Sequence, residues 1–496
     1  MLVLETLPDL LRAAAERFGA RPAYVEGAST LSYADLLARV EATATGYAEA
    51  GVGSGDRVVL WGPNSTDWAV AALAVSYAGG VLVPVNSRYV GAEVADVVER
   101  TSAALVVVHD GFLGRDQLTE LADAGVSERV TTLDAAALPP KKLDSRAFPE
   151  VAPDDVADIL FTSGTTGRSK GAMSAHRQSI GVARAWAELG GVREDDRYLV
   201  VNPFFHSFGY KIGIIVGLLT GATLYPVATF DVDETMRLIE SERITVFPGA
   251  PTLFQSMLSA PGRAERDLSS LRLAVTGAAV VPVILIERMR APEPEGLAID
   301  QVVTAFGMTE AVVVTMCREG DSAETIATTN GRAIPGMETT IAENGELLVR
   351  GDYVMLGYLD DPEATREAID EDGWLHTGDV GSLDDQGNLK ITDRLKDMYI
   401  SGGFNVYPAE VEQTLMRMDG VADVAVVGVP DERMGEVGKA YVVRAEGATL
   451  TEEAVIAFAK ERLANFKVPR QVEIVDALPR NLSGKVLKTE LRSHDG

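Results

Sequence analysis

Segment Leu160–Gly171 combines the residue types that bind phosphate groups. It reads Leu-Phe-Thr-Ser-Gly-Thr-Thr-Gly-Arg-Ser-Lys-Gly, follows a short apolar run and precedes a helical pattern. Such a loop offers backbone N–H groups, hydroxyls and one lysine to an anion. Gly164 and Gly167 allow close approach and positive φ, and Lys170 adds a positive charge. We expect a triphosphate as the ligand, with a surface loop of small polar residues as the alternative; the lysine spacing excludes a Walker A loop.

A single histidine lies among four aromatic side chains in Asn202–Lys211, directly after an apolar run. Apolar ligand pockets are commonly lined by aromatic rings around a few polar groups. This pattern predicts an acid-binding pocket that includes Phe205, His206 and Tyr210, to which we add Ala278 from a later turn, and we count His206 among the catalytic candidates as well. The alternative is a core histidine whose ring nitrogens are satisfied. Lys211 would meet a polar group of the substrate or, alternatively, lie at the surface.

A small-residue turn follows the apolar run 271–276. Side chains as small as those of Gly277, Ala278 and Ala279 let a planar ring such as adenine stack on the backbone. Tight packing within the turn is the alternative. The sequence therefore offers a nucleotide-base site here without deciding between the two.

Segment Phe306–Glu310 offers groups for a phosphate and its metal. Gly307 frees the backbone, and Thr309 can bind a phosphate oxygen. Glu310 supplies a carboxylate, and Mg²⁺ prefers one or two carboxylates together with phosphate oxygens. The alternative for Glu310 is an acid at a helix N-terminus.

Three further polar residues follow turns in the last third of the chain. Asp379 follows a tight turn and could accept both hydroxyls of a ribose, or serve the turn itself. Arg394 can reach a phosphate or ribose with its fork of donors, or form a surface salt bridge. Lys485 lies in a Ser/Gly loop, where an isolated lysine would normally be solvent-exposed.

Short strand patterns alternate with helical patterns over most of the chain. They span 57–61, 80–85, 104–109, 158–161, 198–201, 222–227, 244–248, 271–276 and 301–306. This alternation predicts an α/β fold of mainly parallel sheets with helices, whose ligands lie beyond the carboxyl ends of the strands. Shorter strands from about residue 335 predict a small β-barrel-like part. We expect a large N-terminal domain over 1–394 and a small α+β C-terminal domain over 395–496.

Composition excludes several classes of protein. The chain has 496 residues and 45 Lys and Arg against 73 Asp and Glu, a net charge of −28. Nucleic acid and anionic membrane surfaces are disfavoured as partners because both require a basic surface. Cys317 is the only cysteine, so an intrachain disulfide and a cysteine-rich metal site are excluded. The start of the chain reads as a lead into a helix over 7–18 rather than a signal peptide, and no apolar run could span a bilayer. We expect a cytoplasmic enzyme.

Taken in order, six motifs resemble those of the adenylate-forming superfamily, which includes acyl-CoA synthetases, luciferases and the adenylation domains of peptide synthetases. They span 162–171, 306–310, 377–379, 393–396, 401–410 and 479–485. The resemblance implies that an acid attacks the α-phosphate of ATP to give an acyl-adenylate and pyrophosphate, and that CoA then attacks the adenylate. It also implies that the small C-terminal domain is mobile and rotates about a hinge between the two steps.

The resemblance assigns the nucleotide and its metal to residues of four motifs. The first motif is expected to bind the β- and γ-phosphates, and the second the α-phosphate and Mg²⁺. The next two are expected to bind the ribose and the rest of the nucleotide. The residues in that order are Thr162, Ser163, Thr165, Thr166 and Lys170; Thr309 and Glu310; and Asp379 with Arg394.

Four residues of the expected C-terminal domain also match motif positions. Lys396 matches the hinge, and Lys485 matches the lysine that bridges the carboxylate and the α-phosphate during adenylation. Gly402 and Gly403 belong to the loop that enters the site in the thioester-forming pose. A catalytically inactive binding protein with this fold is disfavoured, because it should lack Lys485 or Glu310.

Within the superfamily, 204–213 and 394–405 are most similar to actinobacterial ligases of steroid breakdown, which activate a propanoate side chain on a bicyclic indanedione. We therefore predict ATP, Mg²⁺, CoA and a bicyclic steroid-derived propanoate as the small-molecule partners. A medium- or long-chain fatty acid or an aryl acid is the alternative substrate. A stand-alone adenylation enzyme that loads a carrier protein is the alternative function, for which Asp231 is a candidate partner of an amino-acid ammonium group. A homodimer is retained as a hypothesis.

Overall fold

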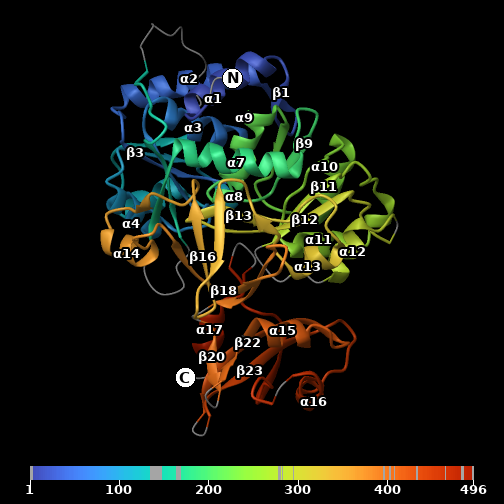
Figure 1. Cartoon of the computed structure of the whole chain (residues 1–496). Helices are drawn as coiled ribbons and strands as arrows, with labels where there is room; N and C mark the ends of the chain where they lie inside the picture. The colour runs from blue at the N-terminus through green and yellow to red at the C-terminus, as the bar shows by residue number, and fades with distance from the viewer. Residues whose placement is uncertain are drawn as a thin grey trace.

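The computed structural model describes residues 4–133, 148–162, 169–277, 281, 283–293, 295–394, 397–401, 404–406, 408–431, 434–463, 465–481 and 485–493. Figure 1 shows a large N-terminal part and a smaller lobe, built from the C-terminal residues, beneath it. The division into a large and a small domain is therefore confirmed. Its predicted position, between 394 and 395, borders residues outside the described part of the chain and stays a prediction.

A seven-stranded sheet contains the strand that precedes the predicted phosphate loop. Its order is β17 (Gly357–Tyr358), β8 (Gly171–Ala175), β7 (Val156–Phe161), β4 (Val81–Val85), β3 (Arg57–Trp61), β5 (Leu105–Val108) and β6 (Val130–Thr132). The strands from β7 to β6 are parallel, whereas β8 and β17 extend the β7 edge in antiparallel orientation. The predicted parallel core is present, with antiparallel strands added at the edge that carries the loop.

A second sheet is built from two four-stranded halves. One half has the order β2 (Ser29–Ser32), β1 (Pro22–Glu26), β10 (Thr223–Pro226) and β9 (Arg197–Val200), and the other β11 (Leu273–Gly277), β12 (Gln301–Met308), β13 (Ala311–Met316) and β14 (Arg332–Ala333). Val246 bridges to Tyr198 of β9 and to Leu273 of β11, and so joins the halves. The β1–β10, β10–β9 and β11–β12 pairs are parallel, and the outer pairs are antiparallel.

Helices cover these sheets on both faces. They are α1 (Leu7–Phe18), α2 (Tyr33–Glu49), α3 (Thr66–Tyr77), α4 (Gly91–Thr101), α5 (Gln117–Asp123), α7 (His176–Gly190), α8 (Ser207–Gly209), α9 (Val216–Thr220), α10 (Val232–Glu242), α11 (Pro251–Ser259), α12 (Val283–Arg290), α13 (Ala323–Thr328) and α14 (Pro362–Ala368), with short turns η1 (Phe112–Gly114), η2 (Tyr210–Ile215) and η3 (Arg263–Glu265). Alternate residues of β3 pack on different helices: Val58 shares a core cluster with α3, and Val59 shares one with Val94 of α4. Burial on both faces explains why these strands read as continuous apolar runs. Helix α7 contacts β7, β8 and β13 and so lies between the two sheets (Figure 1).

A third sheet occupies the position of the expected barrel-like part. Its strands are β15 (Met337–Ile341), β16 (Glu346–Gly351), β18 (Leu375–Leu383) and β19 (Leu389–Arg394), all antiparallel. Within the described residues this sheet is open, so the expectation of a barrel is corrected to an open four-stranded sheet. Strands β15 and β19 lie at its opposite edges, and among the described residues no pairing joins them.

The C-terminal lobe has its own sheet and core. Its elements are β20 (Tyr399–Ser401), β21 (Phe404–Val406), α15 (Pro408–Leu415), β22 (Val421–Asp431), β23 (Gly435–Arg444), α16 (Glu452–Arg462), β24 (Gln471–Val475) and α17 (Lys488–Ser493). Strand β23 forms the centre of the sheet: β22 pairs with it in a long antiparallel hairpin, and β20 and β24 pair with it on its other side, β24 in parallel. Val411, Val426, Val442 and Val455 form a core separate from that of the sheets above. This is the expected α+β unit.

The expected first helix is present as α1. Its N-terminal turn is capped by Thr6, whose hydroxyl accepts a hydrogen bond from the Asp9 N–H, and it ends at Gly19, where φ is +41°. Among the described helices, none has the length and apolar character needed to cross a membrane.

Candidate active site

Glu310 and Thr309 lie in the turn of the β12–β13 hairpin. Met308 pairs with Ala311, so these two residues alone connect the strands. The alternative that Glu310 opens a helix is therefore wrong. Gly307 lies at a register shift in β12, and a Cβ there would lie only 2.0 Å from the carbonyl oxygen of Val312. A glycine is required because the hairpin backbones approach closely at this point.

The predicted base-binding turn lies beside this hairpin. Strands β11 and β12 are parallel, and Gly277 pairs with Ala305, next to Phe306. A Cβ on Gly277 would lie 2.8 Å from the Ala305 carbonyl oxygen. The carboxyl ends of both strands thus meet at one edge of the sheet. Ala278 and Ala279 lie outside the described residues.

The two ends of the predicted phosphate loop are held together at its base. The Thr162 N–H donates to the carbonyl oxygen of Lys170 at 2.8 Å, and the Lys170 N–H donates to the Thr162 hydroxyl at 3.3 Å. Arg100 of α4 donates to the Ser169 carbonyl at 2.6 Å and lies 4.8 Å above the ring of Phe161. The positions between them, Ser163, Gly164, Thr165, Thr166 and Gly167, lie outside the described residues.

Tyr358 joins the phosphate segment to the Glu310 hairpin. Its hydroxyl donates to Oε1 of Glu310 at 2.7 Å, and the ammonium of Lys170 lies 5.0 Å from the centre of its ring. Glu310 is 8% exposed, so this hydrogen bond lies largely away from bulk water. Two residues predicted separately from the sequence are thus brought together by a third that the sequence analysis missed. The only local signal was a tyrosine after a glycine, at the end of an apolar run that precedes two aspartates.

Backbone pairing fixes the position of Tyr358. The N–H groups of Leu356 and Leu359 donate to the carbonyls of Met173 and Gly171, each at 2.8 Å. The Met355 N–H donates to the Glu310 carbonyl, also at 2.8 Å. The short strand β17 is therefore attached to both the phosphate segment and the hairpin turn.

Asp379 and Arg394 occupy facing positions on β18 and β19. Asp379 is 5% exposed, and its N–H donates to the Thr377 hydroxyl at 3.1 Å. Gly378, between Thr377 and Asp379, has a φ of +69°, which a glycine adopts without strain. The strand register thus brings together the two residues predicted at the ribose, as neighbours across one backbone pair.

Of the predicted acid pocket, His206 and Phe205 have surface available. His206 is exposed, and its Nδ1 accepts the Phe208 N–H at 3.2 Å, which places the proton of the neutral ring on Nε2. The alternative of a core histidine is therefore wrong. Phe205 is half-buried beside it.

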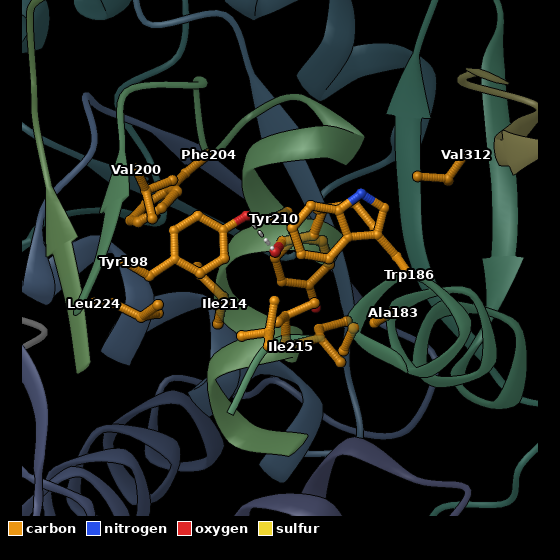
Figure 2. Close-up of a cluster of buried hydrophobic side chains, with 14 of the residues drawn as sticks. Ala183, Trp186, Tyr198, Val200, Phe204, Tyr210, Ile214, Ile215, Leu224 and Val312 are labelled. Carbon is orange, nitrogen blue, oxygen red and sulfur yellow. Dashed lines mark hydrogen bonds between the residues drawn. The ribbon is translucent and has the colours of Figure 1, made fainter. Parts of the chain in front are cut away.

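Tyr210 and Lys211 belong to the core in this structure, which corrects their placement on a pocket wall. Figure 2 shows Tyr210 among Trp186, Tyr198 and Phe204, and its side chain is 0% exposed. The ring of Tyr210 packs edge-on against Trp68 of α3, whereas the side chain of Lys211 extends to β7. Lys211 is 1% exposed and its ammonium pairs with Asp158, so the surface alternative for this lysine is wrong.

Lys485 lies in a short loop of the C-terminal lobe. Its N–H donates to Oδ1 of Asn481 at 2.9 Å, the Asn481 N–H returns a bond of 2.8 Å to the Lys485 carbonyl, and a bridge between Arg480 and Val486 closes the loop. The predicted hinge and loop residues Lys396, Gly402 and Gly403 lie outside the described residues. The described candidate residues are thus divided between the large part, which carries those predicted to meet the nucleotide (the nucleotide-facing group), and one lysine on the small lobe.

Two family models match this chain, AMP-binding enzyme over residues 11–359 and AMP-binding enzyme C-terminal domain over 410–485. The chain belongs to the AMP-binding enzymes, the adenylate-forming superfamily that its motifs resemble. It is 56% identical to the 3-[(3aS,4S,7aS)-7a-methyl-1,5-dioxo-octahydro-1H-inden-4-yl]propanoyl:CoA ligase of Rhodococcus jostii, over 98% of each chain. It is 51% identical to the protein of the same name from Mycobacterium tuberculosis, over 99% of each. The crystal structure of ATP-bound MatB from Rhodopseudomonas palustris matches with a TM-score of 0.88 and 31% identity, over 99% of each chain.

Proposed function

We propose that this protein is an ATP- and Mg²⁺-dependent acyl-CoA ligase whose acid is a bicyclic, steroid-derived propanoate. The observation that carries the proposal is the 56% identity, over 98% of both chains, to a ligase named for an indanedione propanoyl group. Relatives named for other acids are less similar: a feruloyl-CoA synthase is 38% identical and a long-chain fatty acid ligase 35% identical.

The reaction proceeds by two displacements at one site. A carboxylate oxygen of the acid attacks the α-phosphorus of ATP, the bond to the β-phosphate breaks, and pyrophosphate leaves. The CoA sulfur then attacks the acyl carbon, the bond to the phosphate oxygen breaks, and AMP leaves as the thiol gives up its proton. Neither step changes the oxidation state of any atom.

The residues of the nucleotide-facing group divide the nucleotide between them in this proposal. The β- and γ-phosphates are held by the loop between β7 and β8, the base stacks on the β11 turn beside the β12–β13 hairpin, and the ribose is held at the β18–β19 pair. The residues are, in that order, Thr162, Ser163, Gly164, Thr165, Thr166, Gly167 and Lys170; Gly277, Ala278, Ala279, Phe306 and Gly307; and Asp379 with Arg394. Thr309 contacts the α-phosphate.

Glu310 fits a magnesium site. It is one nearly buried carboxylate with a hydroxyl donor on Oε1, and Mg²⁺ typically takes one or two carboxylates and completes its shell with phosphate oxygens and water. The bound ion would neutralise charge on the pyrophosphate as it leaves. Glu310 would hold the ion; the Tyr358 hydroxyl donates to this carboxylate, and the Lys170 ammonium lies against the ring of Tyr358.

Lys485 supplies the charge that adenylation requires. A carboxylate and a triphosphate repel each other, and one cation about 4 Å from a unit charge contributes about 4 kcal/mol at an effective dielectric constant of about 20. Holding the two reactants in line contributes about 7–11 kcal/mol more. Because Lys485 lies on the small lobe, a rotation of that lobe about Lys396 would remove it after the first step and bring Gly402 and Gly403 to the site for the second.

Two further aspects belong to the same proposal. The single cysteine and the acidic composition fit a cytoplasmic enzyme. A homodimer is the hypothesis for its assembly, which light scattering of the purified protein tests.

A panel of acids tests the proposal. Pyrophosphate release and CoA-thioester formation are measured with bicyclic propanoates, medium- and long-chain fatty acids, aryl acids and amino acids, with and without CoA. We expect thioester from the bicyclic propanoates at a kcat/KM well above that for every other class. Turnover only with another acid would overturn the substrate. Pyrophosphate release without thioester, followed by transfer to a carrier protein, would overturn the ligase.

A further inference from the structure

Within this proposed function, we infer that Tyr358 is a positioning residue for the two charged groups that meet the nucleotide and its metal. Its hydroxyl orients the carboxylate of Glu310, and its ring holds the ammonium of Lys170. None of the sequence motifs that define the site contains this tyrosine.

The hydroxyl restricts the Glu310 carboxylate. A hydrogen bond of 2.7 Å to Oε1 fixes the plane of the group and leaves Oε2 for a cation. A bond between a neutral hydroxyl and an ionised carboxylate is charge-assisted and stronger than a neutral pair. Phenols ordinarily titrate at about pH 10, so the hydroxyl is a donor at physiological pH.

The ring acts on the other charged group. The Lys170 ammonium lies 5.0 Å from the ring centre, within the distance of about 6 Å at which a cation is attracted to an aromatic face. Lys170 is at the end of the phosphate loop, where its side chain has several rotatable bonds. The ring thus restricts the flexible Lys170 side chain, as the hydroxyl restricts the Glu310 carboxylate.

Tyr358 can do this because its own backbone is anchored on three sides. Leu356 and Leu359 on either side of it are bonded to β8, and the Tyr358 N–H donates to the Thr365 hydroxyl of α14 at 2.9 Å. A Cβ on Gly357 would lie 2.8 Å from the Thr365 side chain, and the φ of Gly357 is +141°. The backbone of Tyr358 is therefore held in place, as is required of a residue that positions other side chains.

Two substitutions separate the hydroxyl from the ring. Tyr358→Phe removes only the hydroxyl, and Tyr358→Leu removes the ring as well. Metal affinity is measured as the Mn²⁺ concentration that half-saturates the complex of the enzyme with a non-hydrolysable ATP analogue, by electron paramagnetic resonance. Nucleotide affinity is measured by calorimetry with the same analogue without metal. Tyr353→Phe, which removes the hydroxyl of a half-buried tyrosine five positions away, is the matched control.

The two roles predict different results. Tyr358→Phe should raise the half-saturating Mn²⁺ concentration about 10- to 100-fold, the usual loss when the partner of a metal ligand is removed. It should leave the metal-free affinity for the analogue within about twofold, because the ring remains under Lys170. Tyr358→Leu should show the same metal defect and, in addition, weaken metal-free binding about two- to fivefold.

The inference is overturned if Tyr358→Phe binds Mn²⁺ as tightly as Tyr353→Phe does, or if Tyr358→Phe and Tyr358→Leu weaken metal-free binding equally. Thermal unfolding of each variant shows whether it is folded at the assay temperature. If both Tyr358→Phe and Tyr358→Leu unfold below that temperature, the result contradicts a role confined to the site. These assays contain no acid and no CoA. A wrong substrate therefore leaves them unchanged, whereas wild-type protein that does not bind the ATP analogue would overturn the proposed function itself.

Discussion

The ammonium of Lys211 lies 3.0 Å from Oδ1 of Asp158, and the two side chains are 1% and 0% exposed. The other carboxylate oxygen of Asp158 accepts the Ser179 hydroxyl at 2.9 Å. Lys211 lies in η2, just after His206, and Asp158 lies in β7, just before the phosphate segment. One buried ion pair therefore connects the segment predicted to meet the acid with the strand predicted to meet the nucleotide.

Removing one member of this pair should destabilise the N-terminal domain. Lys211→Met leaves a buried carboxylate uncompensated, and we expect a loss of about 3–5 kcal/mol in its free energy of unfolding. Urea unfolding followed by tryptophan fluorescence measures it, because all four tryptophans, Trp61, Trp68, Trp186 and Trp374, precede the C-terminal lobe.

The double variant Lys211→Met/Asp158→Asn controls for that interpretation. Its amide oxygen can still accept the Ser179 hydroxyl while no charge remains, so most of the lost stability should return. A single variant within about 1 kcal/mol of the wild type, or a double variant less stable than the single, would contradict a coupled pair.

Stability should fall in mild acid because of His176. The imidazole is 1% exposed, and its Nδ1 accepts the N–H of Leu7 at 3.3 Å. Burial lowers the pKa of His176 from 6.5 to about 4. Between these values the unfolded chain binds a proton that the folded chain does not, so this stability is fully present above the unfolded pKa and is lost as the pH falls toward the folded one. The loss amounts to about 3 kcal/mol by pH 4.

Unfolding midpoints in urea at a series of pH values from 4.5 to 7.5 measure this effect. His176→Asn offers an uncharged acceptor at the same site, so its stability should depend less steeply on pH over that range. An identical pH dependence in the variant and the wild type would exclude His176 as the source.

Asp379→Asn tests the ribose site. Hydrogen bonds to a charged partner contribute about 1.5–3 kcal/mol, so we expect the Kd for ATP to rise about 10- to 100-fold with little change in the melting temperature. Asp385→Asn, at an exposed position of the following turn, removes the same charge and should bind ATP as the wild type does. Equal affinities for the two variants would favour the alternative that Asp379 serves only its turn.

Lys485→Ala should separate the two chemical steps. We expect adenylate formation to slow about 10²- to 10³-fold, as when one preorganised stabilising group is lost. Thioester formation from supplied acyl-adenylate should change far less, because in the proposed mechanism that step uses the other face of the lobe. Lys460→Ala, which removes an exposed lysine of α16 on the same lobe, is the matched control. Equal losses in both steps would rule out the assignment of two poses.

Patterns within short segments were sufficient for much of the architecture and for the type of chemistry. The apolar runs of β3, β4, β5 and β7 predict buried parallel strands, because burial on both faces leaves no alternation. The glycines and the lysine of the phosphate segment, and the order of the six motifs, indicate an adenylate-forming enzyme. Local spacing carries this information because each motif is one short continuous segment of the chain.

Only the tertiary structure decided how these turns meet. Glu310 lies in a hairpin turn because β13 returns along β12, Lys211 is buried because Asp158 lies opposite it, and Tyr358 reaches Glu310 because β17 pairs with β8. The Tyr358–Glu310 contact joins residues 48 positions apart, and the Lys211–Asp158 pair is also distant in sequence, whereas the β12–β13 hairpin is a local antiparallel pairing. The sequence by itself indicated the phosphate- and metal-binding groups of the candidate site but not Tyr358; strand order and burial decided which residues touch, because neither quantity is a property of a single segment.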